Sequence, residues 1–467
     1  MRSSSFALLL ALLSVGACTS GTTPAPPRPN VLLVSIDSLR ADHVHAYGYE
    51  RPTSPTIDSI AADGVLFEQA ISPSSWTLPT HVTLLTALPP ELHRVENHRL
   101  RLSERGVTLA EMLREAGYET AAVVGGPLLR SFYGHDQGFD LYDDSTAAER
   151  SDAHRGITSP KLVDRAMAWV RGWHERGGDA PFFLFLHLWD VHYDYAPPAP
   201  YDTMFDPDYT GDLDATDFER HPDIRADMPK RDLEHLRALY DGEIRFTDEQ
   251  LGRLIEVLRS YGALDDTIVV VTADHGDEFF EHGRKGHRKT LFEEIVRIPF
   301  VLRYPRRVPS GQVVERQVRL MDVAPTVLSL AGVANRDRFG VTTGPSWGRA
   351  LDLSPWIDGR SDPADFPTLL AFGRSTGFGP SQHALRTEGW KVVRENGGAK
   401  SEFRHYDLER DPAETRGMRS SRPREDRLQS MLEEYERSWT SRPADLAEPL
   451  QADREHESRL RALGYIE

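Results

Sequence analysis

NVLLVSID, at residues 30–37, is an apolar run that ends on an acidic side chain. Continuous apolar runs of this length are typical of strands that are buried on both faces of a parallel sheet. Similar runs recur along the chain, and longer amphipathic stretches separate them. This alternation predicts an α/β protein. The expected strands are 31–36, 120–124, 182–186, 267–272 and 298–304, and the longest expected helix is 231–261.

The stretches between the strands include one capped helix and one long loop. Thr108 and Glu111 have the spacing of a capping box, and Gly117 follows as a helix terminator. Segment 196–232 is rich in Pro, Asp and Tyr. We therefore expect a helix after Thr108, and an irregular lid or an exposed loop at 196–232.

The character of the chain changes after about residue 380. Segments 384–386, 390–393 and 405–408 read as paired strands, and 426–439 reads as a helix packed on them. We therefore expect a large domain at residues 30–379 and a smaller α+β subdomain at residues 380–467.

The composition indicates a large folded protein with an excess of acid. The chain has 467 residues, of which 39% are hydrophobic and 27% are charged, a balance that supports a sizeable core. Its 72 acidic side chains outnumber its 55 basic ones, so the formal net charge is −17. Attraction to nucleic acid is therefore not expected. An anionic substrate has to be drawn in locally, for instance by a bound cation.

The first residues predict export and a lipid anchor. Residues 6–15 form an apolar run that is too short to span a bilayer but fits an export signal. The sequence Val-Gly-Ala-Cys at 15–18 resembles the lipobox of bacterial lipoproteins, in which the cysteine is lipidated and becomes the first mature residue. We expect a signal peptide at 1–17, then lipidated Cys18 and a Pro- and Thr-rich tether at 18–29.

This reading predicts a protein anchored by lipid in the bacterial cell envelope, in the periplasm or on the outer face. The alternative is an ordinary cleaved signal with an incidental cysteine. Cys18 is the only cysteine of the chain, which excludes an intramolecular disulfide and a cysteine-built zinc site.

Polar side chains follow the expected strands. Asp37 ends the first strand, and Asp274 and His275 follow the strand at 267–272. Because ligands of parallel sheets bind at the carboxyl ends of strands, these distant residues can converge. Carboxylates and an imidazole suit Zn²⁺, Mn²⁺ or a similar ion, although a strand-end Asp can also cap a turn or a helix. Four more imidazoles lie in two short windows, at His187, His192, His282 and His287.

At this point the sequence closely resembles the sulfatase family of the alkaline phosphatase superfamily. Seven stretches match in family order over nearly the whole mature chain. This resemblance implies a large alkaline-phosphatase-like domain with a mostly parallel sheet sandwiched by helices, a divalent metal, a nucleophile at the N-terminus of a helix, and a small C-terminal subdomain. The matching stretches are 30–42, 78–86, 187–192, 272–276, 290–294 together with 297–299, 322–326 and 406–412.

Departures from the family pattern concern the nucleophile and the sulfate contacts. A sulfatase carries Cys or Ser at the first position of Cys-x-Pro-x-Arg and oxidises it to formylglycine. Here that position is Thr77, whose β-carbon already bears a methyl group, so oxidation yields only a ketone. His81 replaces the motif Arg, Ser38 replaces the second Asp of an Asp-Asp metal pair, and Gly-Gly-Pro-Leu-Leu at 125–129 replaces a Gly-Lys-x-His segment. These changes resemble the Thr-nucleophile branches, which include phosphodiesterases, phosphonate monoester hydrolases and phospho-group transferases.

The resemblance assigns roles to the clustered residues. Asp37, Asp274 and His275 bind one divalent ion, Mn²⁺, Zn²⁺ or Ca²⁺, which also activates the Thr77 hydroxyl. His192 and His287 contact the transferred group or protonate the leaving oxygen. The remaining candidates, His81 and His282, either support substrate binding or complete a second metal site.

The sequence thus predicts an exported, lipid-anchored metallohydrolase that cleaves a phosphate or phosphonate ester through a covalent intermediate on Thr77. Three alternatives stay open: a sulfuric ester hydrolase that works without formylglycine, an envelope phospho-group transferase, and a non-catalytic binding protein in which Thr77 only caps a helix. The expected partners are an anionic ester and, through the anchor, the membrane. The sequence makes no prediction of the oligomeric state.

Overall fold

The computed structural model describes residues 28–147, 157–334, 349–361, 369–375, 380–397, 400–420, 422–440, 446–450, 457–458 and 460–461. The expected signal peptide, Cys18 and most of the tether lie outside the described residues.

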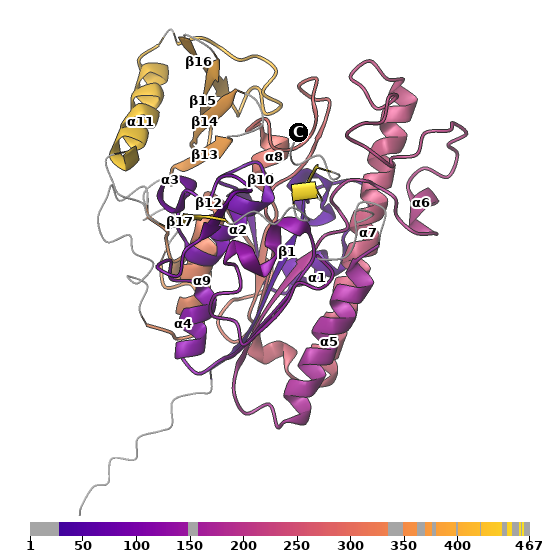
Figure 1. The fold of residues 1–467 in the computed structure, drawn as a ribbon, viewed down its shortest axis with the longest axis vertical. Coiled ribbons are helices and arrows are strands. Elements are labelled where there is room, and N and C mark those ends of the chain that lie inside the picture. The colour runs from indigo at the N-terminus through magenta and orange to yellow at the C-terminus, as the bar shows by residue number, and fades with distance from the viewer. Residues whose placement is uncertain are drawn as a thin grey trace, which may run out of the picture.

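A nine-stranded sheet forms the centre of the molecule (Figure 1). Its strands run in the order β10-β2-β11-β7-β1-β6-β4-β5, and β12 pairs with β2. The five strands from β7 to β5 are parallel, while β11 is antiparallel to both β7 and β2. The bounds are β1 Asn30–Ile36, β2 Val65–Ile71, β4 Glu119–Val124, β5 Leu141–Asp143, β6 Phe182–Leu188, β7 Thr267–Ala273, β10 Arg297–Ile298, β11 Phe300–Arg303 and β12 Gln312–Arg319.

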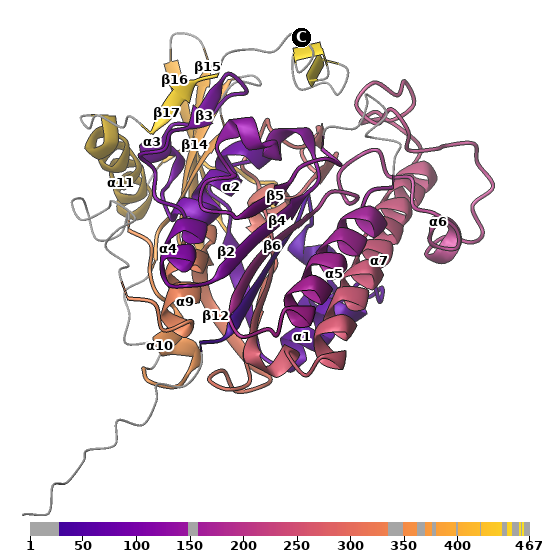
Figure 2. The same ribbon diagram turned by 60° about the horizontal axis from the view of Figure 1, so that its bottom comes forward.

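The central strands are buried along their whole length because helices cover both faces of the sheet. Every residue of β1, β6 and β7 is buried, which explains their continuous apolar runs. Figure 2 shows α1, α5 and α7 on one face and α4, α9 and α10 on the other. The bounds are α1 Pro55–Ala62, α2 Thr77–Thr86, α4 Leu109–Glu115, α5 Ser159–Glu175, α7 Lys230–Ser260, α9 Val323–Leu330 and α10 Ser354–Ile357. The predicted α/β fold with a large, mostly parallel sheet is therefore confirmed.

A small antiparallel sheet packs beside the main sheet, as expected for the C-terminal part of the chain. Its order is β13-β14-β15-β16, and α11 lies against it (Figure 1). The sheet starts at residue 371, before the predicted boundary at 380. The bounds are β13 Ala371–Ser375, β14 Ser381–Arg386, β15 Trp390–Gly397, β16 Lys400–Asp407 and α11 Pro423–Thr440.

Short elements complete the described chain. The strand β17, Ala447–Pro449, pairs with β3, Leu100–Leu102, and so returns the chain from the small sheet to the large domain. Segment 196–232 is mostly irregular and carries the short helix α6, Tyr201–Met204. The other short elements are α3 Pro90–His93, α8 Glu293–Val296, β8 Glu278–Phe279 and β9 Lys285–Gly286, and single 3-10 turns at Ala41–His43, His45–Tyr47, Pro127–Leu129, Ser131–Tyr133, Leu264–Asp266 and Leu320–Asp322.

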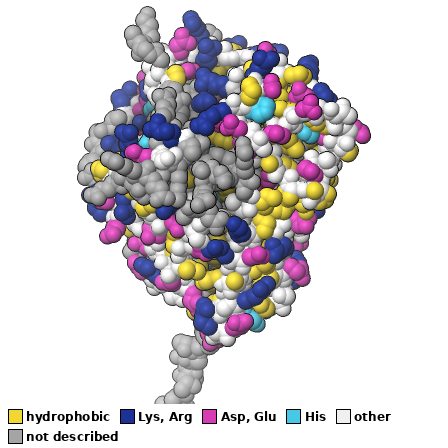
Figure 3. All heavy atoms as spheres, turned by 45° about the vertical axis from the view of Figure 1, so that its right-hand side comes forward, with side chains coloured by type: hydrophobic (Ala, Val, Ile, Leu, Met, Phe, Trp, Pro, Cys, Tyr) yellow, Lys and Arg dark blue, Asp and Glu magenta, His cyan; other side chains and the backbone are white. Residues whose placement is uncertain are grey.

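The surface carries charges of both signs. On the face in Figure 3, acidic and basic side chains are interspersed, so the net charge of −17 is not gathered into one patch on that face. In the part of the chain that the structure describes, none of the helices combines the length and the hydropathy needed to cross a bilayer.

The capping box of α4 gives a test of the local fold. Thr108 Oγ1 accepts a hydrogen bond from the Glu111 N–H at 3.1 Å, and the Glu111 carboxylate accepts one from the Thr108 N–H at 2.8 Å. We expect Thr108→Ala to lower the free energy of unfolding by about 1–2 kcal/mol, measured by urea denaturation. Thr108→Ser keeps the hydroxyl and should lose much less; equal losses in the two variants would show that the cap does not stabilise α4.

Candidate active site

The carboxyl ends of β1 and β7 bring the predicted acidic residues together. The two strands are parallel neighbours with Ile36 opposite Ala273, so the residues that follow, Asp37 and Asp274, are adjacent. Both carboxylates and the His275 ring are fully buried. His275 Nε2 lies 3.3 Å from Asp274 Oδ2 and 3.9 Å from Asp37 Oδ1. The structure thus places the three predicted metal ligands in one cluster.

Ser38 orients both carboxylates. Its backbone N–H donates to Asp274 Oδ1 at 3.2 Å, and its hydroxyl donates to Asp37 Oδ1 at 2.9 Å. To do so Ser38 takes a left-handed backbone conformation with φ of 56°, which is uncommon outside glycine and concentrates at functional sites. The residue that stands in place of a second metal-binding Asp therefore acts by positioning Asp37 and Asp274.

Thr77 places its hydroxyl against this cluster. It is the first residue of α2, and its Oγ1 lies 3.4 Å from Asp37 Oδ2 and 3.4 Å from His275 Nε2. The residue before it, Trp76, makes no side-chain cap at the start of α2. The first turn of a helix carries partial positive charge. The hydroxyl therefore lies where an anionic group is favoured.

The tautomers of His275 and His187 follow from their hydrogen bonds. His275 Nδ1 contacts the Gly276 carbonyl at 3.1 Å, and His187 Nδ1 contacts the Gly125 carbonyl at 2.9 Å. A carbonyl only accepts, so each Nδ1 carries the proton and each Nε2 presents a lone pair. Burial lowers the pKa of His187 to about 4, which keeps this ring neutral at physiological pH.

These lone pairs point toward the two carboxylates. His187 Nε2 lies 3.4 Å from Asp37 Oδ2, and neither this nitrogen nor Asp274 Oδ2 has a hydrogen-bond partner among the described residues. Burial raises the pKa of Asp37 to about 6. Buried acceptor atoms that face one another are costly unless a cation lies between them. The donor set of two carboxylates and two imidazoles fits a divalent ion such as Zn²⁺ or Mn²⁺.

His81 connects the start of α2, where Thr77 lies, to the strand β1. Its Nδ1–H donates to the Thr77 carbonyl at 2.9 Å, and its Nε2 accepts from the Ser35 hydroxyl at 3.0 Å. Its Nδ1 also lies 3.8 Å from Asp274 Oδ2, so His81, His187 and Asp274 form a second group with metal-ligand spacing. Because both ring nitrogens of His81 are already engaged, we assign it to positioning Thr77.

His287 stands on the other side of His275. The two ring centroids are 4.3 Å apart. His287 Nδ1–H donates to Asp277 Oδ1 at 2.6 Å, and Asp277 Oδ2 accepts from the Tyr195 hydroxyl at 2.6 Å. Burial, together with the neighbouring charges of Arg288 and Lys289, holds the pKa of His287 well below its usual range. Its Nε2 has no hydrogen-bond partner in the described chain, so this ring presents an oriented hydrogen-bond acceptor.

His192 completes the imidazole group, whereas His282 lies elsewhere. The His192 ring is 5.0 Å from that of His287 and stacks on Trp189 at 4.0 Å. Its Nδ1–H donates to the Tyr193 carbonyl at 2.7 Å. His282 instead contacts Glu294 at 2.6 Å. The structure therefore brings all the predicted site residues together except His282.

Sequence reasoning missed two contributions to the site. Asp277 is not among the predicted site residues, but it is fully buried and contacts both His287 and Tyr195. The ligand geometry of His187 depends on the Gly125 carbonyl, which lies 62 positions away in sequence. The position of Asp277, two residues after His275, was the only available signal, because its partners come from other segments.

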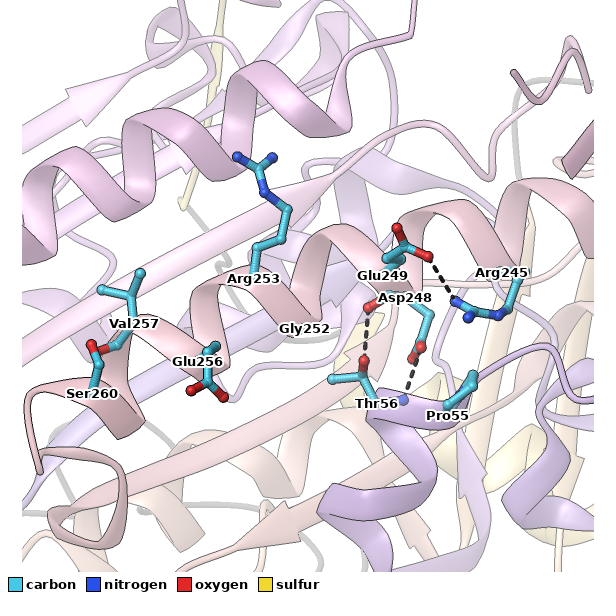
Figure 4. Close-up of a pocket in the computed structure, with 10 residues that line it drawn as sticks. All are labelled: Pro55, Thr56, Arg245, Asp248, Glu249, Gly252, Arg253, Glu256, Val257 and Ser260. Carbon is cyan, nitrogen blue, oxygen red and sulfur yellow. Dashed lines mark hydrogen bonds and ion pairs between the residues drawn. The ribbon is translucent and has the colours of Figure 1, made fainter. Parts of the chain in front are cut away.

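A surface hollow of about 580 Å³ lies between α1 and α7 (Figure 4). Its lining mixes apolar residues such as Pro55 and Val257 with charged ones that are paired with one another, such as Arg245 with Glu249. The C-terminal half of α7, which forms one wall, leads to the amino end of β7. The hollow therefore lies away from the carboxyl ends of the strands, where the Thr77 cluster is located.

Comparisons with known proteins identify the family of this chain. The sulfatase family model matches residues 29–333, and the chain belongs to the sulfatase family. It is 23% identical to an N-acetylglucosamine-6-O-sulfatase of Bacteroides thetaiotaomicron, over 95% of this chain and 92% of that protein. It is 25% identical to the multifunctional alkaline phosphatase superfamily protein PehA of Trinickia caryophylli, over 65% of this chain and 74% of that protein.

The fold is also that of solved relatives. The crystal structure of a phosphonate monoester hydrolase of Agrobacterium radiobacter superposes with a TM-score of 0.69 at 22% identity, over 89% of this chain and 96% of that one. The protein is therefore a sulfatase-family hydrolase with an alkaline phosphatase-like fold.

The raised pKa of Asp37 predicts how metal affinity depends on pH. In the metal-free protein Asp37 carries a proton below about pH 6, and a metal must displace it. We expect the affinity for Zn²⁺ to weaken about tenfold for each pH unit below that value and to level off above it, measured by isothermal titration calorimetry. The Asp274→Ala/His275→Ala variant isolates binding elsewhere on the chain. An affinity for the Thr77 cluster that stays flat from pH 5 to pH 7 contradicts the assignment.

Proposed function

We propose that the protein hydrolyses a phosphate or phosphonate ester through a covalent intermediate on Thr77. The observation that carries this proposal is the position of Thr77 Oγ1, 3.4 Å from Asp37 Oδ2 and 3.4 Å from His275 Nε2 at the start of α2. A hydroxyl in this position is a competent nucleophile once its pKa is lowered.

Asp37, Asp274 and His275 are proposed to hold one divalent ion, with His187 as a fourth ligand. Such an ion, when bound, would lower the pKa of the Thr77 hydroxyl and offset the charge of the incoming ester. Ser38 keeps both carboxylates in place, and the Gly125 and Gly276 carbonyls keep the two rings in the ligating tautomer. The sequence left open a second metal site that includes His81, but both ring nitrogens of His81 already have hydrogen-bond partners.

The charge of the cluster favours a monoanionic ester. Two carboxylates balance one divalent ion, and burial keeps the His187 and His287 rings neutral. The site then has little excess positive charge to stabilise a dianion in a buried, weakly screened place. Phosphate diesters and phosphonate monoesters carry one negative charge on the reacting group, which supports them over phosphate monoesters.

The reaction has two displacements at phosphorus. In the first, Thr77 Oγ bonds to phosphorus, the bond from phosphorus to the alcohol oxygen breaks, and the proton released from the Thr77 hydroxyl passes to the leaving alcohol. In the second, the oxygen of a water molecule bonds to phosphorus, the bond from phosphorus to Thr77 Oγ breaks, and a proton of that water returns to Oγ. His287 Nε2 is the proposed carrier of the proton, since Asp277 orients the ring through Nδ1 and leaves Nε2 open toward the site. His192, 5.0 Å away from His287 between ring centroids, is the proposed contact for the transferred group.

Hydrolysis of a sulfuric ester is the second candidate. It is favoured by the match to the sulfatase family and by relatives named N-acetylglucosamine-6-O-sulfatase and arylsulfatase. The aryl or sugar sulfates that such enzymes cleave are also monoanions at sulfur, so the charge argument accommodates them. Both candidates use Thr77 as the nucleophile. They differ in whether a phosphoryl, phosphonyl or sulfuryl group is transferred to it.

The nucleophile test compares Thr77→Ala and Thr77→Ser on a panel of aryl phosphate diesters, aryl phosphonates and aryl sulfates. We expect Thr77→Ala to lower kcat at least about a thousandfold, whereas Thr77→Ser keeps a hydroxyl and retains part of the activity. Intact-mass measurement after rapid quenching should detect the phosphorylated chain. Faster turnover of the sulfates than of either phosphorus ester supports the second candidate.

Thr86→Ala is a matched control, because Thr86 is a buried threonine at the other end of α2. Its Oγ1 donates only within the helix, to the Val82 carbonyl at 2.6 Å. Activity of Thr77→Ala equal to that of Thr86→Ala shows that Thr77 is not the nucleophile.

We propose further that the protein is exported and anchored by a lipid on Cys18, which the lipobox-like sequence at 15–18 supports. Radiolabelled fatty acid should then enter the wild-type chain in a bacterial host and be absent from Cys18→Ser, followed by autoradiography of the purified proteins. Equal labelling of the two chains shows that Cys18 is not lipidated.

A further inference from the structure

Two carboxylates and an imidazole meet at a second place, where the main sheet adjoins the small one. Glu278 begins β8, His282 lies in the turn between β8 and β9, and Glu294 belongs to α8. One ligand atom from each residue lies within 4.8 Å of the other two. Figure 1 shows α8 beside the strands of the small sheet. None of the three residues contributes to the cluster at Thr77.

Hydrogen bonding defines the state of His282. Its Nε2–H donates to the Ala413 carbonyl at 3.1 Å, and its ring stacks on Phe292 with centroids 3.4 Å apart. Because the carbonyl only accepts, the proton is on Nε2. Nδ1 then faces Glu294 Oε1 at 2.6 Å and Glu278 Oε1 at 3.9 Å. The two oxygens and Nδ1 are all acceptors when the ring is neutral, so the three atoms share either a proton or a metal ion. Against the effect of burial, the hydrogen bond with Glu294 raises the pKa of His282 and favours the proton in the metal-free protein.

Glu278 gives a separate indication of a ligand. The residue is only 1% exposed. Its Oε2 accepts from the Thr290 hydroxyl at 2.6 Å, while its Oε1 has no hydrogen-bond partner within the described residues. Burial and the neighbouring Glu294 raise the pKa of Glu278 to about 7, which His282 opposes. A buried carboxylate oxygen without a partner is costly unless it coordinates a cation.

We propose that Glu278, His282 and Glu294 form a second divalent-metal site, of the kind that takes Zn²⁺ or Mn²⁺, independent of the site at Thr77. Two carboxylate oxygens and one imidazole nitrogen are suitable donors for these ions. The N–H of His282 that donates to a backbone carbonyl is the arrangement that orients a metal-ligating imidazole.

An ion at this site has a structural role. It joins the β8–β9 hairpin to α8 and, through the Ala413 carbonyl, to the chain that follows the small sheet. Asp277 immediately precedes this hairpin and His287 immediately follows it. The ion therefore steadies the two ends of the hairpin that carry the Asp277–His287 pair.

The test uses Zn²⁺ as the probe and metal binding as the readout. In the chelator-treated Asp274→Ala/His275→Ala chain, which lacks two ligands of the Thr77 cluster, we expect one Zn²⁺ per chain by calorimetry and by metal analysis. Adding Glu278→Gln, which keeps the size of the side chain, should raise the Kd for this ion at least about tenfold, since outer-shell partners alone are worth about that much. His174→Ala, an exposed histidine on α5, is the matched control and should leave binding unchanged.

The rival occupant is a proton on His282 Nδ1. In that case the Asp274→Ala/His275→Ala chain takes up no Zn²⁺ although circular dichroism shows it folded, and the proposal is overturned. If that chain does not fold, the wild type is compared with Glu278→Gln directly. A Zn²⁺ count that falls by one per chain supports the site, and an unchanged count overturns it.

Discussion

The site depends on electrostatic crowding at the carboxyl ends of β1, β6 and β7. The carboxylates of Asp37 and Asp274 face the Nε2 lone pairs of His187 and His275. All four side chains are buried, so water does not screen the repulsion between them. Acceptor atoms in such a place repel one another strongly, because the interior screens charge poorly. A bound cation would turn this repulsion into attraction, because all four groups would coordinate it.

The neighbouring backbone controls which atoms face the centre. The carbonyls of Gly125 and Gly276 accept hydrogen bonds from Nδ1 of His187 and His275. Both Nε2 atoms therefore point toward the centre of the site. Ser38 uses its backbone and its hydroxyl to hold one oxygen of each carboxylate, which leaves the other oxygen of each toward the centre. These contacts come from loops that follow strands, where side chains can be aimed while the sheet stays rigid.

The same device recurs at the junction with the small sheet. There the Ala413 carbonyl accepts a hydrogen bond from Nε2 of His282, and Nδ1 points toward Glu278 and Glu294. The β8–β9 hairpin lies between the two clusters, with Asp277 before it and His287 after it. The chain that follows the small sheet therefore contacts the hairpin that separates Asp277 from His287.

The strands of the central sheet could be predicted because both of their faces are covered. A strand in that position needs apolar side chains on both faces, which produces the continuous apolar runs of β1, β6 and β7. The strands β2 and β12 were not predicted, because half-exposed polar residues such as Glu68 and Gln69 interrupt their apolar pattern. The strand β11 was predicted, but only its pairing shows that it runs against its neighbours, since an apolar run carries no direction.

For the site, the sequence by itself determined the nature of the donors and the hydroxyl, since Asp37, Thr77, Asp274 and His275 stand directly after strands or at a helix start. Only the tertiary structure decided that His187 faces this cluster, that Asp277 is buried against His287, and that His282 belongs to a different group. The physical reason is that these roles depend on which ring nitrogen carries the proton. That is determined by carbonyls and carboxylates contributed by other segments, which a linear pattern does not encode.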